Sequence, residues 1–330
     1  MEAQPIQSDI MNRCKGCIVG ALIGDAWGAP LEFVQTVTAS LVDAAMKMNG
    51  GGPLNVGPAQ ITDDGELTLC VLQGLANCKD GYDPDKICIE YGRWIQSRPF
   101  DIGATTRNAL MHASSMSPHM SERVTKAAKD MSHSVSNGST MKFSPTAVYC
   151  SFIKNTDELI KLVTTETNHM HHNKEVVDCN IAFALAIRVL IQGGTPQDAY
   201  NAQREYALKS SIKGWVEEME SGVFHPPNRS IGYVKIAYQQ AFHHLKSGTG
   251  YVDALKAILV QGGDTDTNAC IAGMLLGARD GFDALPEELK TKVLKADTKG
   301  PKPRPEFLRP GVVLDKNFEQ LMANCAKLAI

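Results

Sequence analysis

Two short segments of the sequence each combine two carboxylates with a threonine hydroxyl. Thr62-Asp63-Asp64 and Asp264-Thr265-Asp266-Thr267 both stand directly before an apolar pattern with helical spacing, so each should lie at the start of a helix. Carboxylate and hydroxyl oxygens are the hard ligands that Mg²⁺ and Mn²⁺ select. If the fold brings the segments together, their side chains can hold two ions; the candidate ligands are Thr62, Asp63, Asp64, Asp264, Asp266 and Thr267.

The same acids allow other interpretations. Acids and threonines also cap free backbone N–H groups at helix starts, and Asp63 with Glu66 resembles a capping box. An EF-hand loop is excluded, because Ala269 stands where that loop needs glycine and Leu275 where it needs glutamate. The D-x-D-x-T pattern of phosphohydrolases fits poorly, because Asn268 replaces its threonine, but a metal-dependent phosphohydrolase remains an alternative function.

The elements that must position these acids are predicted to be helices. Apolar residues recur at spacings of three and four almost throughout, for example at Leu67, Val71 and Leu75 and in a stripe from Ile231 to Leu245, so we expect an all-α fold. Loop signals are short and lie between helical patterns. They predict a single compact domain over residues 1–330, with a motif-bearing core at about 12–285 and a C-terminal loop and helix at 286–330.

The spacing of three glycines and the composition of a basic segment allow two further structural predictions. Gly16, Gly20 and Gly24 are four residues apart, which leaves one helix face without side chains and lets another backbone approach it. The basic stretch 290–304 is interrupted by Asp297 and by prolines, and we interpret it as a solvated loop.

The composition indicates which classes of binding partner and which location to expect. The net charge of −3 gives no overall positive field, so we expect neither a nucleic-acid nor a membrane partner. No apolar run reaches the roughly 20 residues of a bilayer span and no secretory signal pattern opens the chain, so we expect a cytoplasmic location. Nine cysteines fit reduced thiols, and Cys14 and Cys17 fit helix residues better than a zinc or redox motif. Without a zipper pattern, we expect a monomer.

Taken together, the motifs resemble the ADP-ribosylglycohydrolase family. They occur in the family's order and run from about residue 16 to 285: the segment 20–28 (GALIGDAWG) with Glu32, Thr62-Asp63-Asp64, Asn137-Gly138-Ser139-Thr140-Met141, Asn168-His169 and the segment 261–267 (QGGDTDT). The resemblance implies a compact all-α fold with a binuclear Mg²⁺ or Mn²⁺ centre in a central cleft.

The resemblance also implies individual roles. Thr62, Asp63 and Asp64 would bind one ion, and Asp264, Asp266 and Thr267 the other or both. Glu32 would act beside the metals together with Asp63, whereas Asp25 would brace the glycine-rich segment around it. The expected substrate contacts are Asn137, Gly138, Ser139, Thr140 and Met141 at the diphosphate and His169 nearby, with His171 and His172 as alternatives to His169.

Two features resemble one branch of the family, the dinitrogenase reductase-activating glycohydrolases. In Phe100-Asp101-Ile102-Gly103, Asp101 would meet an arginine guanidinium and Gly103 would line the site, although Asp101 also suits a helix cap. Tyr233 would stack on the adenine. Gly65 departs from the family pattern, which usually has threonine after Thr-Asp-Asp.

The activity implied is metal-dependent hydrolysis of the N-glycosidic bond between ADP-ribose and protein arginine, which reverses mono-ADP-ribosylation. The expected partners are an ADP-ribosylated protein and ADP-ribose. Two further alternatives are hydrolysis of O-linked ADP-ribose, on serine or as O-acetyl-ADP-ribose, and an ADP-ribose-binding module without turnover.

Overall fold

The computed structural model describes residues 6–113, 118–297, 301–304 and 309–328, and the all-helical prediction is confirmed there. Within those ranges, extended pairing is limited to two isolated bridges, Gly51 with Val56 and Ser136 with Tyr233. The helices are α1 (Ser8–Gly28), α2 (Ala39–Ala45), α3 (Asp63–Ala76), α4 (Pro84–Gln96), α5 (Ala104–Leu110), α6 (Met120–Ala128), α7 (Ser144–Cys150), α8 (Thr156–Thr167), α9 (Lys174–Ile191), α10 (Pro196–Ala207), α11 (Lys213–Glu220), α12 (Val234–Ser247), α13 (Tyr251–Leu259), α14 (Thr265–Asp280), α15 (Glu287–Leu294) and α16 (Pro310–Leu328).

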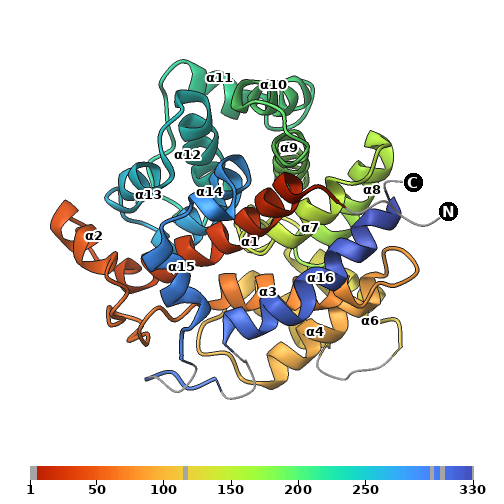
Figure 1. The fold of residues 1–330 in the computed structure, drawn as a ribbon, viewed down its shortest axis with the longest axis horizontal. Helices are drawn as coiled ribbons and strands as arrows, with labels where there is room; N and C mark the ends of the chain where they lie inside the picture. Colours follow the sequence, from red (N-terminus) through yellow and green to blue (C-terminus); the bar gives the residue numbers. More distant parts are fainter. Residues whose placement is uncertain (1–5, 114–117, 298–300, 305–308, 329–330) are drawn as a thin grey trace.

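Helices α1 and α14 form the central pair of the fold (Figure 1). The predicted glycine face of α1 is confirmed: a Cβ at Gly16, Gly20 or Gly24 would collide with backbone atoms of α14. A Cβ at Gly28 would likewise collide with the backbone of Asp266. Because only glycine permits this approach, the end of α1 fixes the start of α14, where the second acidic segment lies.

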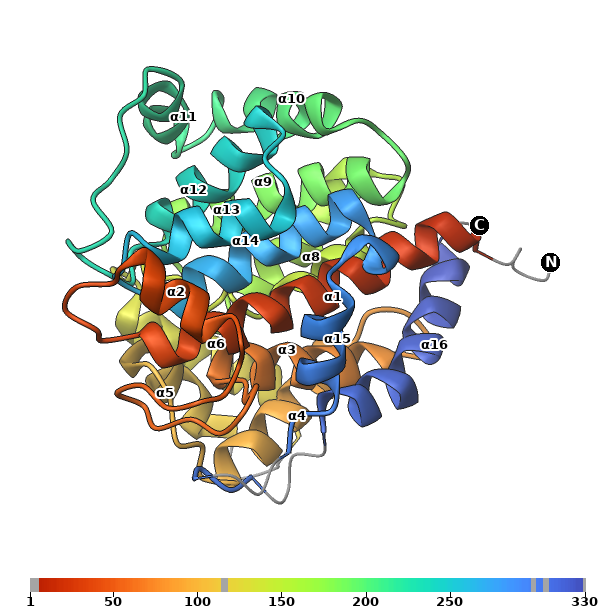
Figure 2. The ribbon, with the colours of Figure 1, turned by 60° about the vertical axis from the view of Figure 1, so that its left-hand side comes forward.

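The remaining helices lie on two sides of α1. Helices α9, α10, α12 and α13 lie on the side of α14, whereas α3, α4 and α16 lie on the opposite side (Figures 1 and 2). One cluster of buried apolar side chains extends from Cys14 on α1 to Cys325 on α16. The two acidic segments, which open α3 and α14, therefore approach the central helix from opposite sides.

Two expectations about individual segments are wrong. Helix α12 begins only at Val234, so Ile231 is an exposed loop residue and not part of its apolar stripe. The basic stretch is not a solvated loop throughout, because Lys290 belongs to α15 and both Lys290 and Arg304 are buried. All nine cysteines are buried free thiols, with Cys14 and Cys17 inside α1 as expected.

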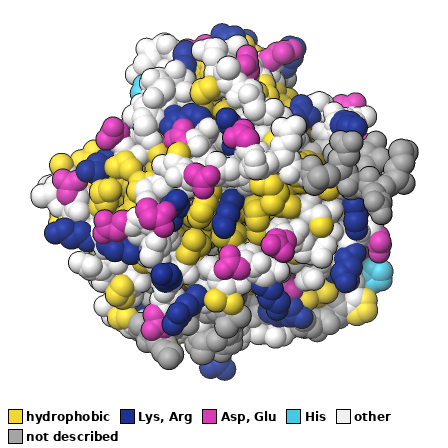
Figure 3. Space-filling view, viewed as in Figure 1, with side chains coloured by type: hydrophobic (Ala, Val, Ile, Leu, Met, Phe, Trp, Pro, Cys, Tyr) yellow, Lys and Arg dark blue, Asp and Glu magenta, His cyan; other side chains and the backbone are white. Residues whose placement is uncertain are grey.

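Acidic and basic side chains are interspersed over the face drawn in Figure 3. Within the described ranges, every helix is too short or too polar to cross a bilayer.

Candidate metal centre and substrate pocket

A cavity of about 410 Å³ opens where the two acidic segments meet. Its walls come from the loop after α1, the start of α3, the loop before α5, the loop before α7, the loop before α12 and the start of α14. Most of the predicted site residues line it: Glu32, Asp63, Asp64, Asp101, Gly103, Asn137, Gly138, Met141, Asp264, Asp266 and Thr267.

Asp25 holds the first acidic segment in place. Its carboxylate accepts hydrogen bonds from the Thr62 backbone N–H (3.0 Å), the Thr62 hydroxyl (2.9 Å) and the Gly65 N–H (2.8 Å). The segment around Asp25 is the last turns of helix α1 and not a glycine-rich turn, so Asp25 braces the start of α3 instead. A Cβ at Gly65 would lie 2.6 Å from Asp25 Oδ2, which explains in this chain the glycine where the family usually has threonine.

Three carboxylates from separate segments converge in the pocket. Glu32, Asp101 and Asp266 each offer an oxygen within 4.8 Å of the others. In the described part of the chain, the buried atoms Glu32 Oε2 and Asp64 Oδ1 have no hydrogen-bond partner. Buried carboxylate oxygens without donors are costly unless a cation or proton compensates them, so these oxygens fit a hard divalent cation. Of the six ligands predicted from the sequence, only Asp266 belongs to this cluster of three carboxylates.

Electrostatics in the pocket favours the same conclusion. Burial raises the pKa of Glu32 to about 8, with the negative charges of Asp264 and Asp101 adding to the effect. Burial and neighbouring carboxylates also raise the pKa values of Asp63, Asp64 and Asp266 well above the usual range. Like charges at such distances repel, and cations would remove that repulsion and keep the acids ionised at neutral pH.

The two threonines lie among the acids. The Thr62 hydroxyl is 3.3 Å from Asp64 Oδ2 and 3.5 Å from Asp266 Oδ2, and the Thr267 hydroxyl is 3.3 Å from Asp64 Oδ2. Thr62 is the N-cap residue of α3, but its side chain caps no backbone N–H. The capping box of Asp63 with Glu66 is therefore wrong, because Asp63 is already the first residue of α3 and Glu66 instead pairs with Arg304.

Asp101 does not cap a helix either. The N-cap of α5 is Gly103, which has no side chain to cap the helix, and Asp101 lies two residues before it. The Asp101 carboxylate faces the pocket, and burial together with the charge of Asp264 raises its pKa. The Gly103 backbone N–H lies close enough to the Asp63 carboxylate to lower its pKa, which partly offsets the effect of burial.

The loop predicted to bind diphosphate contributes only part of its residues to the pocket. Asn137 lines it and donates from Nδ2 to Asp264 Oδ2 (2.8 Å), and Gly138 and Met141 line it beside Asn137. Ser139 and Thr140 are buried away from it, and the Thr140 hydroxyl donates to Asn180 Oδ1 (2.7 Å). Their hydroxyls therefore stabilise the loop from the core side.

The histidine expected to contact substrate lies elsewhere. His169 is fully buried, with Nε2 3.0 Å from the Ser121 hydroxyl and Nδ1 3.2 Å from the Glu166 carboxylate, and it does not line the pocket. His171 lies closer, since its Nε2 is 2.8 Å from the hydroxyl of the pocket residue Ser136. The predicted histidine, His169, is therefore two positions before His171, the histidine that contacts a pocket residue.

Tyr233 stands behind the pocket wall. It is half-buried at the N-cap of α12, and its hydroxyl donates to Glu175 Oε2 (3.3 Å). Its ring contacts those of Trp215 and His225 edge to face. The preceding residues Ile231 and Gly232 line the pocket instead.

Sequence reasoning assigned no role to several pocket residues, although Ile102, Thr105 and Thr106 lie within or beside the segment 100–103 that it singled out. Phe33 follows Glu32 with 57% of its surface exposed and a φ of 63°, a left-handed conformation that is rare for a bulky residue. The other missed residues are Ile102, Ala104, Thr105, Thr106, Ser136, Ile231 and Gly232. Ser136 opens the loop signal that continues with Asn137 and Gly138, and it could have been included with them.

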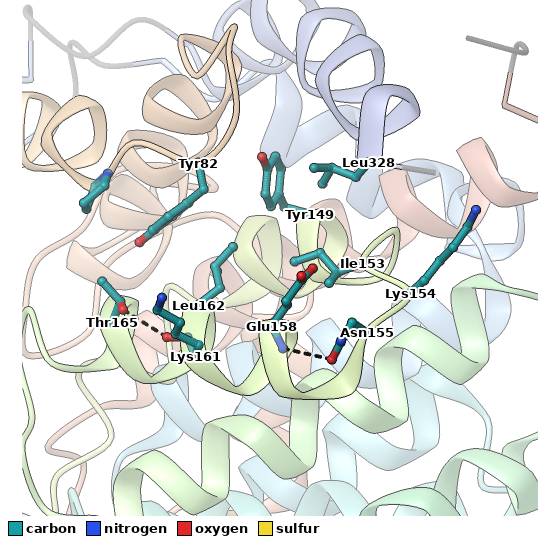
Figure 4. A pocket seen from close by; sticks show the side chains of 11 residues that line it. Tyr82, Tyr149, Ile153, Lys154, Asn155, Glu158, Lys161, Leu162, Thr165 and Leu328 are labelled. Carbon is teal, nitrogen blue, oxygen red and sulfur yellow. Dashed lines mark hydrogen bonds between the residues drawn. The ribbon is translucent and has the colours of Figure 1, made fainter. Parts of the chain in front are cut away.

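A second cavity, of about 460 Å³, lies between α7, α8 and the end of α16 (Figure 4). Tyr82, Tyr149 and Leu162 form its apolar floor, and Lys154 and Lys161 stand at its edge. None of the predicted site residues lines this cavity. The chemistry-bearing groups therefore gather in the first cavity.

Comparisons with known proteins match one family over most of the chain. A family model described as ADP-ribosylglycohydrolase matches residues 6–316. The ADP-ribosyl-(dinitrogen reductase) glycohydrolase of Rhodospirillum rubrum is 29% identical over 286 residues, covering 86% of this chain and 91% of that protein. The ADP-ribosylarginine hydrolase Tri1 of Pseudomonas putida (strain GB-1) is 25% identical, covering 86% of this chain and 74% of that protein.

A more distant relative and a solved structure extend the comparison. The ADP-ribosylhydrolase ARH3 of Bos taurus is 22% identical, covering 84% of this chain and 87% of that protein. A solved structure titled ADP-ribosylglycohydrolase-related protein complex shares the fold with a TM-score of 0.72 at 21% identity, covering 98% of this chain and 100% of that chain. Because the family model matches most of the sequence, this chain belongs to the ADP-ribosylglycohydrolase family.

Proposed function

We propose that this protein hydrolyses the N-glycosidic bond between ADP-ribose and an arginine side chain, using two divalent cations, Mg²⁺ or Mn²⁺. The observation that carries the proposal is the convergence of carboxylates from four segments on one pocket beside the Asn137-Gly138 loop. The names of the relatives from Rhodospirillum rubrum and Pseudomonas putida support the arginine linkage.

The residues that would hold the cations come from both acidic segments. They are Thr62, Asp63 and Asp64 for one ion and Asp264, Asp266 and Thr267 for the other or both, with Glu32 beside them. When bound, such cations supply positive charge that orients sugar hydroxyls and lowers the pKa of water. The unpartnered oxygens of Glu32 and Asp64 support this assignment.

The chain's own groups would position ADP-ribose. Gly138 presents backbone to the pocket, and diphosphate oxygens can approach it because no side chain intervenes. The Asn137 amide, tied to Asp264, links this loop to the acidic segment. His171 replaces His169 as the histidine nearest the substrate, acting through Ser136, and Tyr233 supports the wall formed by Ile231 and Gly232 from behind.

Carboxylates would carry the proton transfers. Burial and the neighbouring negative charges raise the pKa of Glu32 in the metal-free site. With cations bound, Glu32 would be ionised, and its carboxylate could accept the proton that water loses as it attacks the anomeric carbon. The C–N bond breaks through an oxocarbenium-like state, the water oxygen joins the sugar and the guanidine nitrogen leaves. Asp101 would receive two parallel hydrogen bonds from the guanidinium group.

One assay tests the proposal directly. An arginine-linked ADP-ribosyl peptide is incubated with the protein and Mg²⁺ or Mn²⁺, with a chelator in the parallel sample, and free ADP-ribose is measured. Release that depends on the cation is expected. Binding without release would indicate an ADP-ribose-binding module, and release of phosphate would indicate a phosphohydrolase. Release of ADP-ribose only from serine-linked peptide or from O-acetyl-ADP-ribose would indicate an O-linked specificity. Each of these outcomes overturns the proposal.

A further inference from the structure

A buried arginine from the C-terminal part of the chain pairs with a glutamate of α3, the helix whose start supplies two pocket carboxylates. Only 3% of Arg304 is exposed. Its guanidinium makes a bidentate pair with Glu66, with Nε 2.8 Å from Oε1 and Nη2 2.9 Å from Oε2. It also donates from Nη1 to the Ser97 carbonyl and from Nη2 to the Ser97 hydroxyl, both at 2.8 Å.

The two partners of Arg304 belong to segments that supply site carboxylates. Glu66 lies in the first turn of α3, two residues after Asp64. Ser97 is the C-cap residue of α4, four residues before Asp101. One guanidinium therefore connects the start of α3 to the loop that carries Asp101.

We propose that Arg304 is a positioning residue, which acts through Glu66 and Ser97 to orient the carboxylates at the start of α3 toward a divalent cation. The inference rests on the proposed cation site. The start of α3 is then held from two directions, by Asp25 through Thr62 and Gly65 and by Arg304 through Glu66.

Neighbouring contacts anchor this arrangement. The Trp94 indole N–H donates to Glu66 Oε2 (2.6 Å), which further restricts the Glu66 carboxylate. Gln60, two residues before Thr62, donates from Nε2 to the Lys302 carbonyl (2.8 Å). The planar guanidinium of Arg304 donates to Glu66 and to Ser97 at once. The ammonium group of lysine has no such planar set of donors, so Arg304→Lys should not restore both contacts.

The test measures cation affinity, not activity. Mn²⁺ is titrated into the metal-free parent, Arg304→Gln and Arg304→Lys by calorimetry, well below their melting temperatures. Groups that orient metal ligands typically contribute 10–100-fold to metal affinity, so both variants should bind Mn²⁺ about tenfold more weakly or worse. The matched control is Arg204→Gln, because Arg204 makes a similar bidentate pair with Glu220 (2.7 and 3.1 Å) outside the pocket and should leave Mn²⁺ affinity unchanged.

A double variant separates positioning from folding. Arg304→Gln leaves the buried Glu66 carboxylate without its guanidinium, which could unfold the protein. Glu66→Gln/Arg304→Met removes both charges and keeps an acceptor oxygen for the Trp94 N–H. If this variant folds and also binds Mn²⁺ about tenfold more weakly, the positioning role stands, even if the parent releases no ADP-ribose and the proposed activity fails. Unchanged Mn²⁺ affinity in a folded variant, or no Mn²⁺ binding by the parent, overturns the inference.

Discussion

The Asp25 carboxylate near the end of α1 accepts hydrogen bonds from both the backbone N–H and the hydroxyl of Thr62, at 3.0 and 2.9 Å. This contact connects the central helix α1 to the first acidic segment. Helix α1 is held against α14 by glycine contacts, and Asp25 on α1 fixes the segment that opens α3. The two acidic segments are therefore positioned by the same helix.

Replacing Asp25 should affect both stability and cation binding. Asp25→Ala leaves the buried Thr62 and Gly65 N–H groups without acceptors, and each such loss costs about 1–3 kcal/mol. We expect a lower melting temperature and weaker Mn²⁺ binding. Asp25→Asn keeps one acceptor oxygen and should give an intermediate result. Thermal unfolding of Asp25→Ala at the parent's temperature would contradict this role.

The ligand assignment predicts the effect of removing single carboxylates. Asp63→Ala and Asp266→Ala should each weaken Mn²⁺ binding in calorimetry and abolish turnover, while circular dichroism shows the helical fold intact. Asp157→Ala, an exposed acid at the start of α8, serves as the control and should bind Mn²⁺ like the parent. Two Mn²⁺ ions bound normally by both site variants would show that the assignment is wrong.

Cation removal should lower stability as well as activity. A ligand that binds only the folded state stabilises it by about 2.7 kcal/mol at 100 times its dissociation constant. Because the buried carboxylates repel one another, Mg²⁺ at millimolar concentration should raise the melting temperature of the parent, and less so that of Asp266→Ala. An unchanged melting temperature in the parent would be evidence against a metal site.

Replacing Gly138 should weaken the binding of ADP-ribose without weakening the binding of Mn²⁺. A Cβ at Gly138 would lie 2.9 Å from the Thr106 hydroxyl and 3.6 Å from His171 Cε1, so even a small side chain is crowded there. Gly138→Val should therefore weaken ADP-ribose binding, measured by calorimetry with Mn²⁺ present, while Mn²⁺ affinity stays near that of the parent. The control is Gly214→Val, where a Cβ meets no neighbouring atom. Unchanged ADP-ribose affinity would place the diphosphate elsewhere.

The acidic segments could be predicted from sequence because their ligand sets are local. Thr62, Asp63 and Asp64 are consecutive, and the helix that follows them is marked by its apolar pattern. Asp101 could be identified only through resemblance, since a single aspartate before a helix also suits a cap. In the structure the N-cap of α5 is Gly103 and not Asp101.

The positions of the two histidines and of Arg304 depend on tertiary contacts, which no local sequence pattern indicates. His169 and His171 are two residues apart, and only the fold determines that one faces Glu166 and the other Ser136. Arg304 lies in a stretch with the composition of a solvated loop, yet its partner Glu66 is 238 residues away in sequence. A charged residue whose partner is so distant looks like a surface residue in the sequence.

His171 predicts a pH dependence of stability. Burial lowers its pKa to about 3, and the positive charges of Lys142 and His172 add to the effect. The unfolded chain accepts a proton on this ring near pH 6.5, but the folded protein does not until about pH 3. The stability that His171 contributes is therefore complete above pH 6.5 and is lost as pH falls toward 3, by at most about 1.4 kcal/mol per pH unit.

Urea unfolding of the parent and His171→Asn between pH 7 and pH 4 measures this dependence. Other groups titrate in both proteins, so the difference between the two curves isolates His171. The parent's free energy of unfolding should fall faster with acid than that of the variant. The exposed His112 provides the control, and His112→Asn should follow the parent. Parallel curves for the parent and His171→Asn would contradict the buried, neutral state of this ring.

The last prediction concerns the linkage that is cut. The Asp101 carboxylate faces the pocket within 4.8 Å of oxygens of Glu32 and Asp266, and it caps no helix. An arginine leaving group is planar and permanently charged, so it can donate two hydrogen bonds to this carboxylate. A serine leaving group carries no charge and would leave Asp101 unpaired, which costs about 1–3 kcal/mol or more for a charged group.

Arginine-linked peptide should therefore be hydrolysed at least about tenfold faster than serine-linked peptide, judged by kcat/KM, because 1.4 kcal/mol corresponds to one decade. Asp101→Asn keeps the shape and one acceptor oxygen but removes the charge. It should lower kcat/KM for the arginine-linked peptide by about tenfold or more and leave the melting temperature nearly unchanged, while the control Asp157→Asn alters neither. Asp101 does not select the leaving group if Asp101→Asn keeps full activity on the arginine-linked peptide, or if the parent cleaves the serine-linked peptide equally well. In the first case the specificity must arise from other pocket residues, such as the exposed Phe33 and Ile231. In the second case the protein has no preference between the two linkages.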